Sequence, residues 1–199
     1  SDLAQYDSLT GLPNRTLLRD RLTRALEQSR RHERPVALLY LDLDNFKQVN
    51  DTLGHEVGDQ LLCSVGARIA TCIRGQDTVA RLGGDEFVVL LPEVTGGEDA
   101  ATVAQQIVDA LSAPHALKAG VVTVTTSIGI ATSQDSADAD DLLRHADYAL
   151  YQAKKRGRNN YQFFDPALHF TVNERRQLLD QLRRGYNEDQ LQVHYQPQL

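Results

Sequence analysis

Hydrophobic positions recur along this chain with two periods, and their alternation predicts an ordered series of helices and strands. Apolar residues spaced three or four apart, as between Leu17 and Leu26, indicate helices with one buried face. Continuous apolar runs indicate strands that are buried on both sides. The predicted elements are a helix between Asn14 and Pro35, a strand over 36–44, a short helix over 46–51, a long helix carrying residues 57–73, strands over 78–82 and 86–91, a helix over 100–111, a strand over 121–131, a helix over 138–156 and a strand over 161–164.

This order predicts an alternating α/β fold with a hairpin inside it. The hairpin is expected at Gly83–Gly84, because two glycines between apolar runs can both adopt positive φ. Helix caps are expected at Asn14 and at either Ser136 or Asp138, whose side chains can accept a backbone N–H.

The character of the sequence changes after Asp165–Pro166. Residues 1–166 hold every element described so far, and only a charged amphipathic helix over 174–184 and a strand over 191–195 follow. Because one helix and one strand cannot build a core, we expect residues 167–199 to be a linker helix and the first strand of a second domain that was cut away.

Composition excludes several classes of function. The 199 residues carry a net charge of −6, which argues against binding of a nucleic-acid polymer, since that needs a basic face. No apolar run approaches the roughly 20 residues that span a bilayer, so no direct membrane contact is expected. Cys63 and Cys72 are poorly spaced for a disulfide, which favours a cytoplasmic location, with any membrane anchor lying elsewhere in a longer parent protein.

Two carboxylates end the first predicted strand. Since strand side chains alternate between faces, Asp42 and Asp44 share one face while Leu41 and Leu43 share the other. A hard divalent cation such as Mg²⁺ would remove the repulsion between two such acids. An exposed strand end with solvated acids is the alternative.

Two further clusters carry candidate chemistry. Asp85 and Glu86 follow the glycine turn directly, where an acid could ligate a metal and accept a proton from a hydroxyl; an ordinary hairpin with exposed acids is the alternative. The basic run from Lys154 to Arg158 ends a predicted helix, where it could bind phosphates or only complement the helix dipole.

Residues 83–87 read GGDEF, and the chain resembles the bacterial family of diguanylate cyclases that is named after this motif. The resemblance covers roughly residues 7–164. The other motifs that carry it, in the family's order and spacing, lie at 7–15, 42–59 and 146–159.

The resemblance implies a fold and an activity. The fold would be that of the nucleotide-cyclase palm, with a mainly antiparallel central sheet flanked by helices. The activity would be condensation of two GTP molecules into cyclic di-GMP with release of pyrophosphate, with Mg²⁺ or Mn²⁺ as cofactor and a homodimer that brings two GTP sites face to face. The alternatives are a catalytically weak module that binds GTP or cyclic di-GMP and regulates a C-terminal phosphodiesterase domain, and a dimerising interaction domain.

The resemblance also implies roles for single residues. The metal ligands would be Asp42, the carbonyl of Leu43, Asp85 and Glu86. Asp85 would also accept the proton of the 3′-hydroxyl, and Lys47 would steady phosphate charge. The residues that would contact GTP are Phe46, Asn50, Asp59, Gly84, Lys154 and Arg158, of which Asn50 and Asp59 would recognise guanine.

Three smaller features complete the comparison with the family. Arg74 and Asp77 stand at the spacing of the family's inhibitory product-binding site, which implies feedback by cyclic di-GMP; a surface ion pair is the alternative. Asn45 stands where the family usually has an aromatic residue, and no metal ligand is affected. Residues 174–197 resemble the start of an EAL-type phosphodiesterase domain, but the EAL residues are absent, so no hydrolytic activity is expected here.

Overall fold

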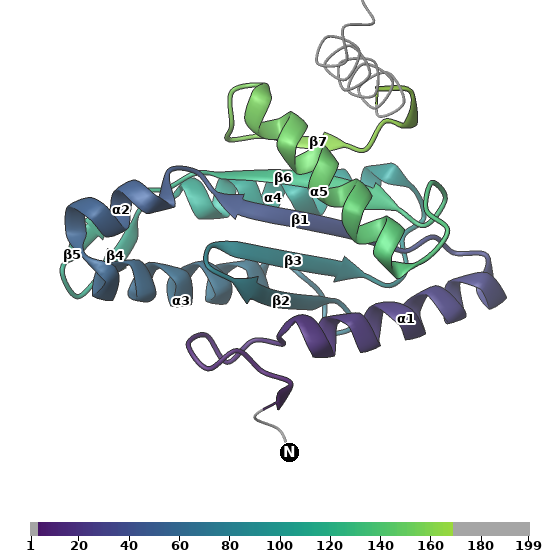
Figure 1. Ribbon diagram of the computed structural model, residues 1–199, viewed down its shortest axis with the longest axis horizontal. Coiled ribbons are helices and arrows are strands. Elements are labelled where there is room, and N and C mark those ends of the chain that lie inside the picture. The colour runs from purple at the N-terminus through teal and green to yellow at the C-terminus, as the bar shows by residue number, and fades with distance from the viewer. Residues whose placement is uncertain (1–3, 169–199) are drawn as a thin grey trace, which may run out of the picture. The chain divides into compact units, whose positions relative to one another are not determined.

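A five-stranded sheet forms the middle of the fold in a computed structural model that describes residues 4–168 (Figure 1). The strand order is β2-β3-β1-β6-β7, and every pair is antiparallel except β6–β7. The strands are β1 (Ala37–Leu43), β2 (Thr78–Gly83), β3 (Glu86–Leu91), β6 (Thr126–Thr132) and β7 (Tyr161–Phe163). The expected α/β fold with a mainly antiparallel central sheet is therefore confirmed.

Helices cover both faces of the sheet (Figure 1). They are α1 (Arg15–His32), α2 (Phe46–Leu53), α3 (His55–Thr71), α4 (Gly97–Ser112) and α5 (Ala139–Lys155). The alternation of strand side chains divides the core in two: Leu39 and Leu41 of β1 pack with α3 and α4, whereas Leu38 and Tyr40 pack with α1 and α5. The end of β1, which carries Asp42, is thus held between two buried layers.

The predicted helix caps are present. The side chain of Asn14 accepts a hydrogen bond from the backbone N–H of Leu17 at the start of α1. Of the two candidates for α5, Asp138 is the cap, and its carboxylate accepts from the N–H of Asp141. Both caps satisfy N–H groups that a helix start leaves without partners.

The single strand expected over 121–131 is wrong. The segment is divided between β5 (Gly120–Val122), which forms a hairpin with β4 (His115–Leu117), and β6. Residues 123–125 connect the two, and the backbone N–H of Asp44 donates to the carbonyl of Thr125 there, at 2.9 Å. β-Branched composition favours extended backbone in general, so it could not reveal that the chain changes sheets.

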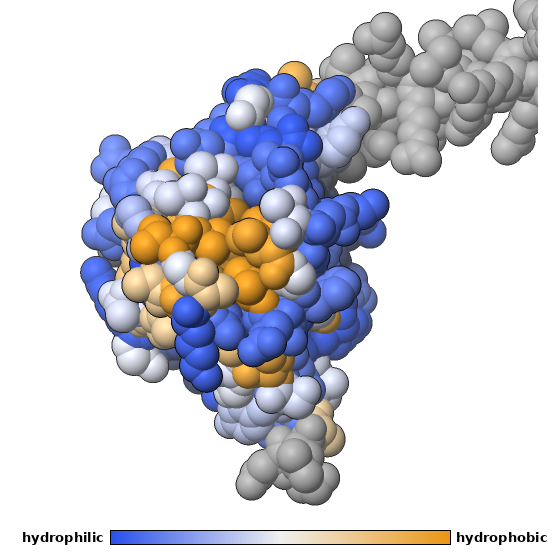
Figure 2. Space-filling view, turned by 90° about the vertical axis from the view of Figure 1, so that its left-hand side faces the viewer, coloured by the Kyte–Doolittle hydropathy of each residue, from blue (hydrophilic) through white to orange (hydrophobic). Residues whose placement is uncertain are grey.

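An apolar patch marks the end of the fold where α2 and the β4–β5 hairpin lie (Figure 2). Leu53 and Val121 are exposed there at 49% and 69%, and both line a cleft of about 500 Å³. The polar wall of this cleft includes Asp44 and Thr125. The cleft therefore lies directly beside the end of β1.

The chain divides into two units, Ser1–Phe164 and Asp165–Leu199. The helix and strand expected over 174–184 and 191–195 lie outside the described residues. None of the helices within 4–168 is long and apolar enough to cross a membrane. Cys63 and Cys72 are both free thiols.

Candidate active site

Two acids that are distant in sequence meet at the end of the sheet. Asp42 of β1 is paired in register with Glu86 of β3, and Asp85 precedes Glu86 directly. The pKa of Asp85 is raised to about 7, first by burial and then by its hydrogen bond with Asp42 and by the negative charge of Asp42. The strand register thus brings the two carboxylates together, as the spacing of the motifs suggested.

One lysine of α5 contacts these acids. Lys154 forms an ion pair with Asp42, whose side chain is 15% exposed. The pKa of Asp147, two helical turns earlier on α5, is raised overall. Burial is the main cause, the positive charge of Lys154 opposes it, and the negative charge of Asp42 adds to it. The charge of the Lys154 ammonium group therefore acts on three acids, Asp42, Asp85 and Asp147, while Glu86 lies opposite Asp42 on β3.

The residues present fit a hard cation. Oδ1 of Asp42 is buried and has no hydrogen-bond partner among the residues that the structure describes, and such an atom needs an explanation. Within the same residues no three acidic, histidine or cysteine side chains form a ready-made metal cluster. That arrangement suits Mg²⁺, which typically takes one or two carboxylates and completes its shell with water and phosphate oxygens.

The glycine turn that presents Asp85 is stabilised by Arg81 of β2 and, through Arg81, by Asp7 outside the hairpin. Gly83 and Gly84 have φ of 135° and 50°, as expected for this turn. The guanidinium of Arg81 donates to the carbonyl of Gly84 at 2.8 and 3.0 Å and to Asp7 at 2.8 Å. Asp7 accepts two more hydrogen bonds from Thr10. The N-terminal motif is thus a brace for the turn, a role that no local pattern could have revealed.

The second acid of this segment directly follows β1 and has different partners. Asp44 is buried, and its two oxygens accept hydrogen bonds from Thr125, Ser127 and Asn159. Asp44 is therefore not the exposed, solvated acid of the alternative interpretation, and protein donors satisfy it in place of a cation shared with Asp42. The hydroxyl residues at 125–127, in an otherwise apolar run, were the available sequence signal.

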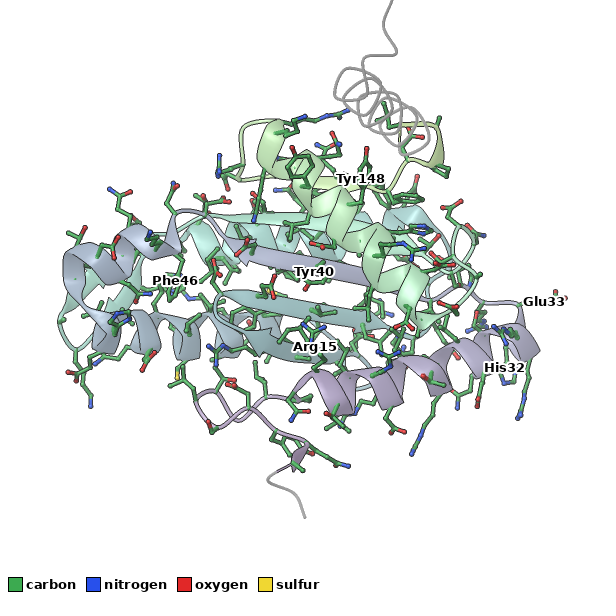
Figure 3. The ribbon with its side chains drawn as sticks, in the orientation of Figure 1. Arg15, His32, Glu33, Tyr40, Phe46 and Tyr148 are labelled. Atoms are coloured by element: carbon green, nitrogen blue, oxygen red, sulfur yellow. The ribbon has the colours of Figure 1, made fainter. Side chains whose placement is uncertain are left out.

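The predicted guanine-reading residues lie on α2 and α3. The side chain of Asn50 lies against Gly58: a Cβ placed on Gly58 would be 1.9 Å from Oδ1 of Asn50 and 3.3 Å from the ring of Phe46. Phe46 is buried at the start of α2 (Figure 3). Asp59 is exposed one position later and lines a groove together with Leu9. The side chain of Asn50 can thus adopt this position only because residue 58 has no side chain.

The predicted phosphate-binding cations differ in placement. Lys154 points to Asp42, whereas Arg158 lies on an exposed loop after α5 with φ of 62°. Lys47 is exposed in the first turn of α2. Asn45 at the N-cap of α2 has φ of 58°, and its side chain does not cap the helix, so the N–H groups of Phe46 and Lys47 can donate to a ligand.

A buried tyrosine lies behind the acids on β1. The pKa of Tyr40 is raised to about 12, first by burial and then by the charges of Glu86 and Asp147, while Arg15 hydrogen-bonds it and acts in the opposite direction. Figure 3 shows Tyr40 in the middle of the fold with Arg15 at the start of α1 nearby. Sequence reasoning missed this contact.

The Arg74–Asp77 segment forms a turn before β2. Its backbone N–H at Arg74 donates to Asp77 at 2.8 Å, and burial raises the pKa of that carboxyl. Asp77 also lines a cleft of about 550 Å³ together with Arg21 and Arg24 of α1. The turn therefore stands beside further guanidinium groups, away from the acids of β1.

Comparison with known proteins identifies relatives over most of the chain. The family described as "Diguanylate cyclase, GGDEF domain" matches residues 4–160. The bifunctional diguanylate cyclase/cyclic di-GMP phosphodiesterase MucR of Pseudomonas aeruginosa is 46% identical over 198 residues, which cover 99% of this chain and 29% of MucR. The chain thus spans less than a third of that relative.

Solved structures agree with the fold. The GGDEF domain of TpbB from P. aeruginosa is 42% identical and superimposes with a TM-score of 0.78, covering 80% of this chain and 94% of that one. The GGDEF domain of DgcB from Caulobacter crescentus, solved with cyclic di-GMP, is 31% identical with a TM-score of 0.76, covering 81% and 94%.

Proposed function

Because this chain belongs to the GGDEF family of diguanylate cyclase domains, we propose that it condenses two GTP molecules into cyclic di-GMP and releases pyrophosphate. The observation that supports this most is the pair Asp42–Asp85, with one buried carboxylate oxygen left without a partner among the described residues. Phosphoryl transfer depends on positioning and charge neutralisation, and this pair stands where both are needed.

A divalent cation is part of the proposal. Asp42, Asp85, Glu86 and the carbonyl of Leu43 would hold Mg²⁺ or Mn²⁺. When bound, such an ion neutralises phosphate charge and makes a nearby hydroxyl more nucleophilic. The raised pKa of Asp85 fits this role, because burial is its main cause and the neighbouring carboxylate of Asp42 adds to it, so that a cation here would offset both.

The protein's own residues would direct the transfer. Asp85 would take the proton of the 3′-hydroxyl, whose oxygen bonds to the α-phosphorus of the second GTP while the bond to pyrophosphate breaks. Lys47, Lys154 and Arg158 would bind the phosphates, together with the free N–H groups at the start of α2. Gly84 would let the backbone approach the nucleotide closely.

Guanine recognition would come from α2 and α3. Asp59 would accept from the N1–H and N2–H of the base, Asn50 would add its amide, and Phe46 supports Asn50 from the core. Adenine would leave the carboxylate unpaired, which makes such a site selective. Since each domain would bind one GTP, two copies of the chain must face each other during catalysis.

A turnover assay tests the proposal. The chain at high concentration with GTP and Mg²⁺ is expected to form pyrophosphate and cyclic di-GMP in a 2:1 ratio. GTP binding without product would instead favour a module that regulates a phosphodiesterase domain. Absence of GTP binding in a calorimetric titration would favour an interaction domain.

Replacing Gly58 by alanine is expected to damage guanine binding without unfolding the protein. The new Cβ would displace the half-buried amide of Asn50, so KM for GTP should rise at least about tenfold. Alanine also favours a helix over glycine by about 1 kcal/mol, so the melting temperature should stay close to that of the wild type. Asn50→Ala is the matched variant, and a normal KM in Gly58→Ala would contradict the role of Asn50.

Product feedback is proposed at the turn of Arg74 and Asp77. Arginine can grip phosphate and stack on guanine, and the half-buried Asp77 can accept from the base. Arg74→Ala is expected to raise the concentration of added cyclic di-GMP that halves the rate by at least about tenfold. Arg34→Ala, another exposed arginine, is the control; equal inhibition of both variants would remove the proposal.

The parent protein is proposed to be larger. MucR carries both activities in its name, and the chain covers only 29% of it. We propose that residues 167–199 begin a phosphodiesterase-type domain and that the parent presents this cyclase domain to the cytoplasm, where GTP is available.

A further inference from the structure

Asp44 joins three segments of the fold through one buried carboxylate. It is 6% exposed. Oδ2 accepts from the hydroxyl of Thr125 at 2.6 Å and from the backbone N–H of Asn159 at 3.0 Å, and Oδ1 accepts from the hydroxyl of Ser127 at 2.6 Å. The end of β1, the start of β6 and the loop after α5 are therefore tied to a single side chain.

These bonds explain how a charge is tolerated at this position. Burial of a carboxylate is costly unless several donors satisfy it, and bonds to an ionised acceptor are short and strong. The hydroxyls of Thr125 and Ser127 each donate their single proton to Asp44. Both carboxylate oxygens of Asp44 accept hydrogen bonds, whereas Oδ1 of Asp42 has no partner within residues 4–168.

The loop that Asp44 holds follows an unusual path. Gly157, Arg158 and Asn159 all have positive φ, of 104°, 62° and 49°. For residues other than glycine this conformation persists only when the surroundings impose it. The bond from the N–H of Asn159 to Asp44 supplies one such restraint, and the side chain of Asn160, which donates to the carbonyl of Arg158 at 2.8 Å, supplies another.

The same acid also lies at the start of α2. It directly precedes Asn45, whose φ of 58° turns the chain into the helix, and its own N–H donates to Thr125. Asp44 therefore links two segments that the proposed function assigns to phosphate binding: the first N–H groups of α2 and the loop that presents Arg158.

We propose that Asp44 is a positioning residue that sets the spacing between these two segments, and so makes the site selective for a triphosphate. It acts through the loop at 157–159 and touches neither the cation nor the reacting atoms. This inference rests on the proposed function.

The test compares two nucleotides that differ only beyond the α-phosphate. The affinities of GMP and of an α,β-methylene analogue of GTP, which cannot react, are measured by calorimetry with Mg²⁺. Asp44→Asn has nearly the same shape but turns an N–H₂ toward a donor. We expect it to weaken binding of the analogue at least tenfold and binding of GMP less than twofold, and we expect the same pattern for Arg158→Ala.

Two double variants test whether Asp44 acts through the loop at 157–159. If Asp44 acts through the loop, Asp44→Asn combined with Arg158→Ala should bind the analogue no more weakly than Arg158→Ala alone. Asn159→Gly keeps the N–H and relieves the positive φ, so in the Asp44→Asn background it should restore part of the lost affinity. If Asp44→Asn does not fold, Ser127→Ala replaces it, because this change removes one of the three hydrogen bonds. It should weaken binding of the analogue by about threefold and leave binding of GMP nearly unchanged.

The outcomes separate this inference from the proposed function. A wild-type chain that binds the analogue no better than GMP would overturn the phosphate sites themselves. A wild type that discriminates, with Arg158→Ala losing discrimination and Asp44→Asn keeping it, would overturn the role of Asp44 alone. Equal weakening of both nucleotides by Asp44→Asn would also overturn it, because that is the result of a general structural role.

Discussion

Replacing Asp85 by asparagine is expected to abolish GTP turnover while making the metal-free protein more stable at pH 8. Turnover should fall on the order of a thousandfold or more, because the variant loses a proposed metal ligand and the proposed proton acceptor together. Stability should change in the opposite direction, because asparagine removes a charge that lies buried beside Asp42.

The pH dependence follows from the pKa of Asp85. Its carboxyl keeps the proton up to about pH 7 in the folded protein but loses it near 3.8 in the unfolded chain. Between these values the folded state binds more protons, so the stability of the metal-free wild type should fall as pH rises from about 4 to 7. Asp85→Asn lacks this loss, and at pH 8 its melting temperature should be about 2–4 °C higher, which corresponds to about 1 kcal/mol.

Thermal melts with and without Mg²⁺ check this expectation. The ion should raise the melting temperature of the wild type at pH 8 and have little effect on Asp85→Asn. At pH 4 the two proteins should melt together, because the wild-type carboxyl is then protonated. Asp135→Asn, which removes an exposed acid, is the control for net charge. An Asp85→Asn variant that keeps its activity, or that loses stability at pH 8, would refute the proposed role of this carboxyl.

Replacing Gly129 by alanine is expected to be the most destabilising single-methyl change in the sheet. A Cβ at this position of β6 would lie 2.1 Å from the carbonyl oxygen of Ala146 and 2.1 Å from the amide nitrogen of Leu150, both in the backbone of α5. No side-chain rotation can relieve contacts with backbone, so α5 must move away from the sheet. We expect a loss of about 3 kcal/mol or more in the free energy of unfolding, or about 6–12 °C in melting temperature.

Gly129→Ala should also impair the candidate active site. Since α5 carries Lys154, which pairs with Asp42, displacement of the helix should also lower GTP turnover. Gly97→Ala is the matched control, because its Cβ would meet only the ring of Phe163, at 3.6 Å, and its stability should stay within about 1 kcal/mol of the wild type. Urea unfolding of both variants measures the difference. Equal stability of the two would show that α5 and β6 do not pack as closely as described.

Helix and strand signals in the sequence were accurate where neighbouring residues decide the structure. Asn14 and Asp138 cap their helices, and Gly83–Gly84 make the expected turn. The strand expected over 121–131 failed for the opposite reason. Its first part forms a local hairpin with β4, whereas its second part pairs with the distant β1, and extended segments of similar composition fit either sheet.

The candidate site shows the same division. The motifs named Asp42 and Asp85, but their contact depends on the register of β1 with β3. The resemblance named Asp42 and not Asp44 as a metal ligand, whereas strand alternation alone gave both acids the same face. The partners of Asp44 are Thr125, Ser127 of β6 and the loop after α5, and they make it a buried hydrogen-bond acceptor, while Asp42 lies beside Asp85 and Lys154.

By itself the sequence determined the α/β character of this protein, the order of its helices and most of its strands, and the set of residues able to bind a cation and a nucleotide. These properties follow from periodicity, caps and turns, which act over a few neighbouring positions. Only the tertiary structure decided which of those residues meet, such as Asp7 with Arg81 and Asp44 with Asn159. The reason is that strand order and register bring together residues far apart in the chain, and no local pattern records such contacts.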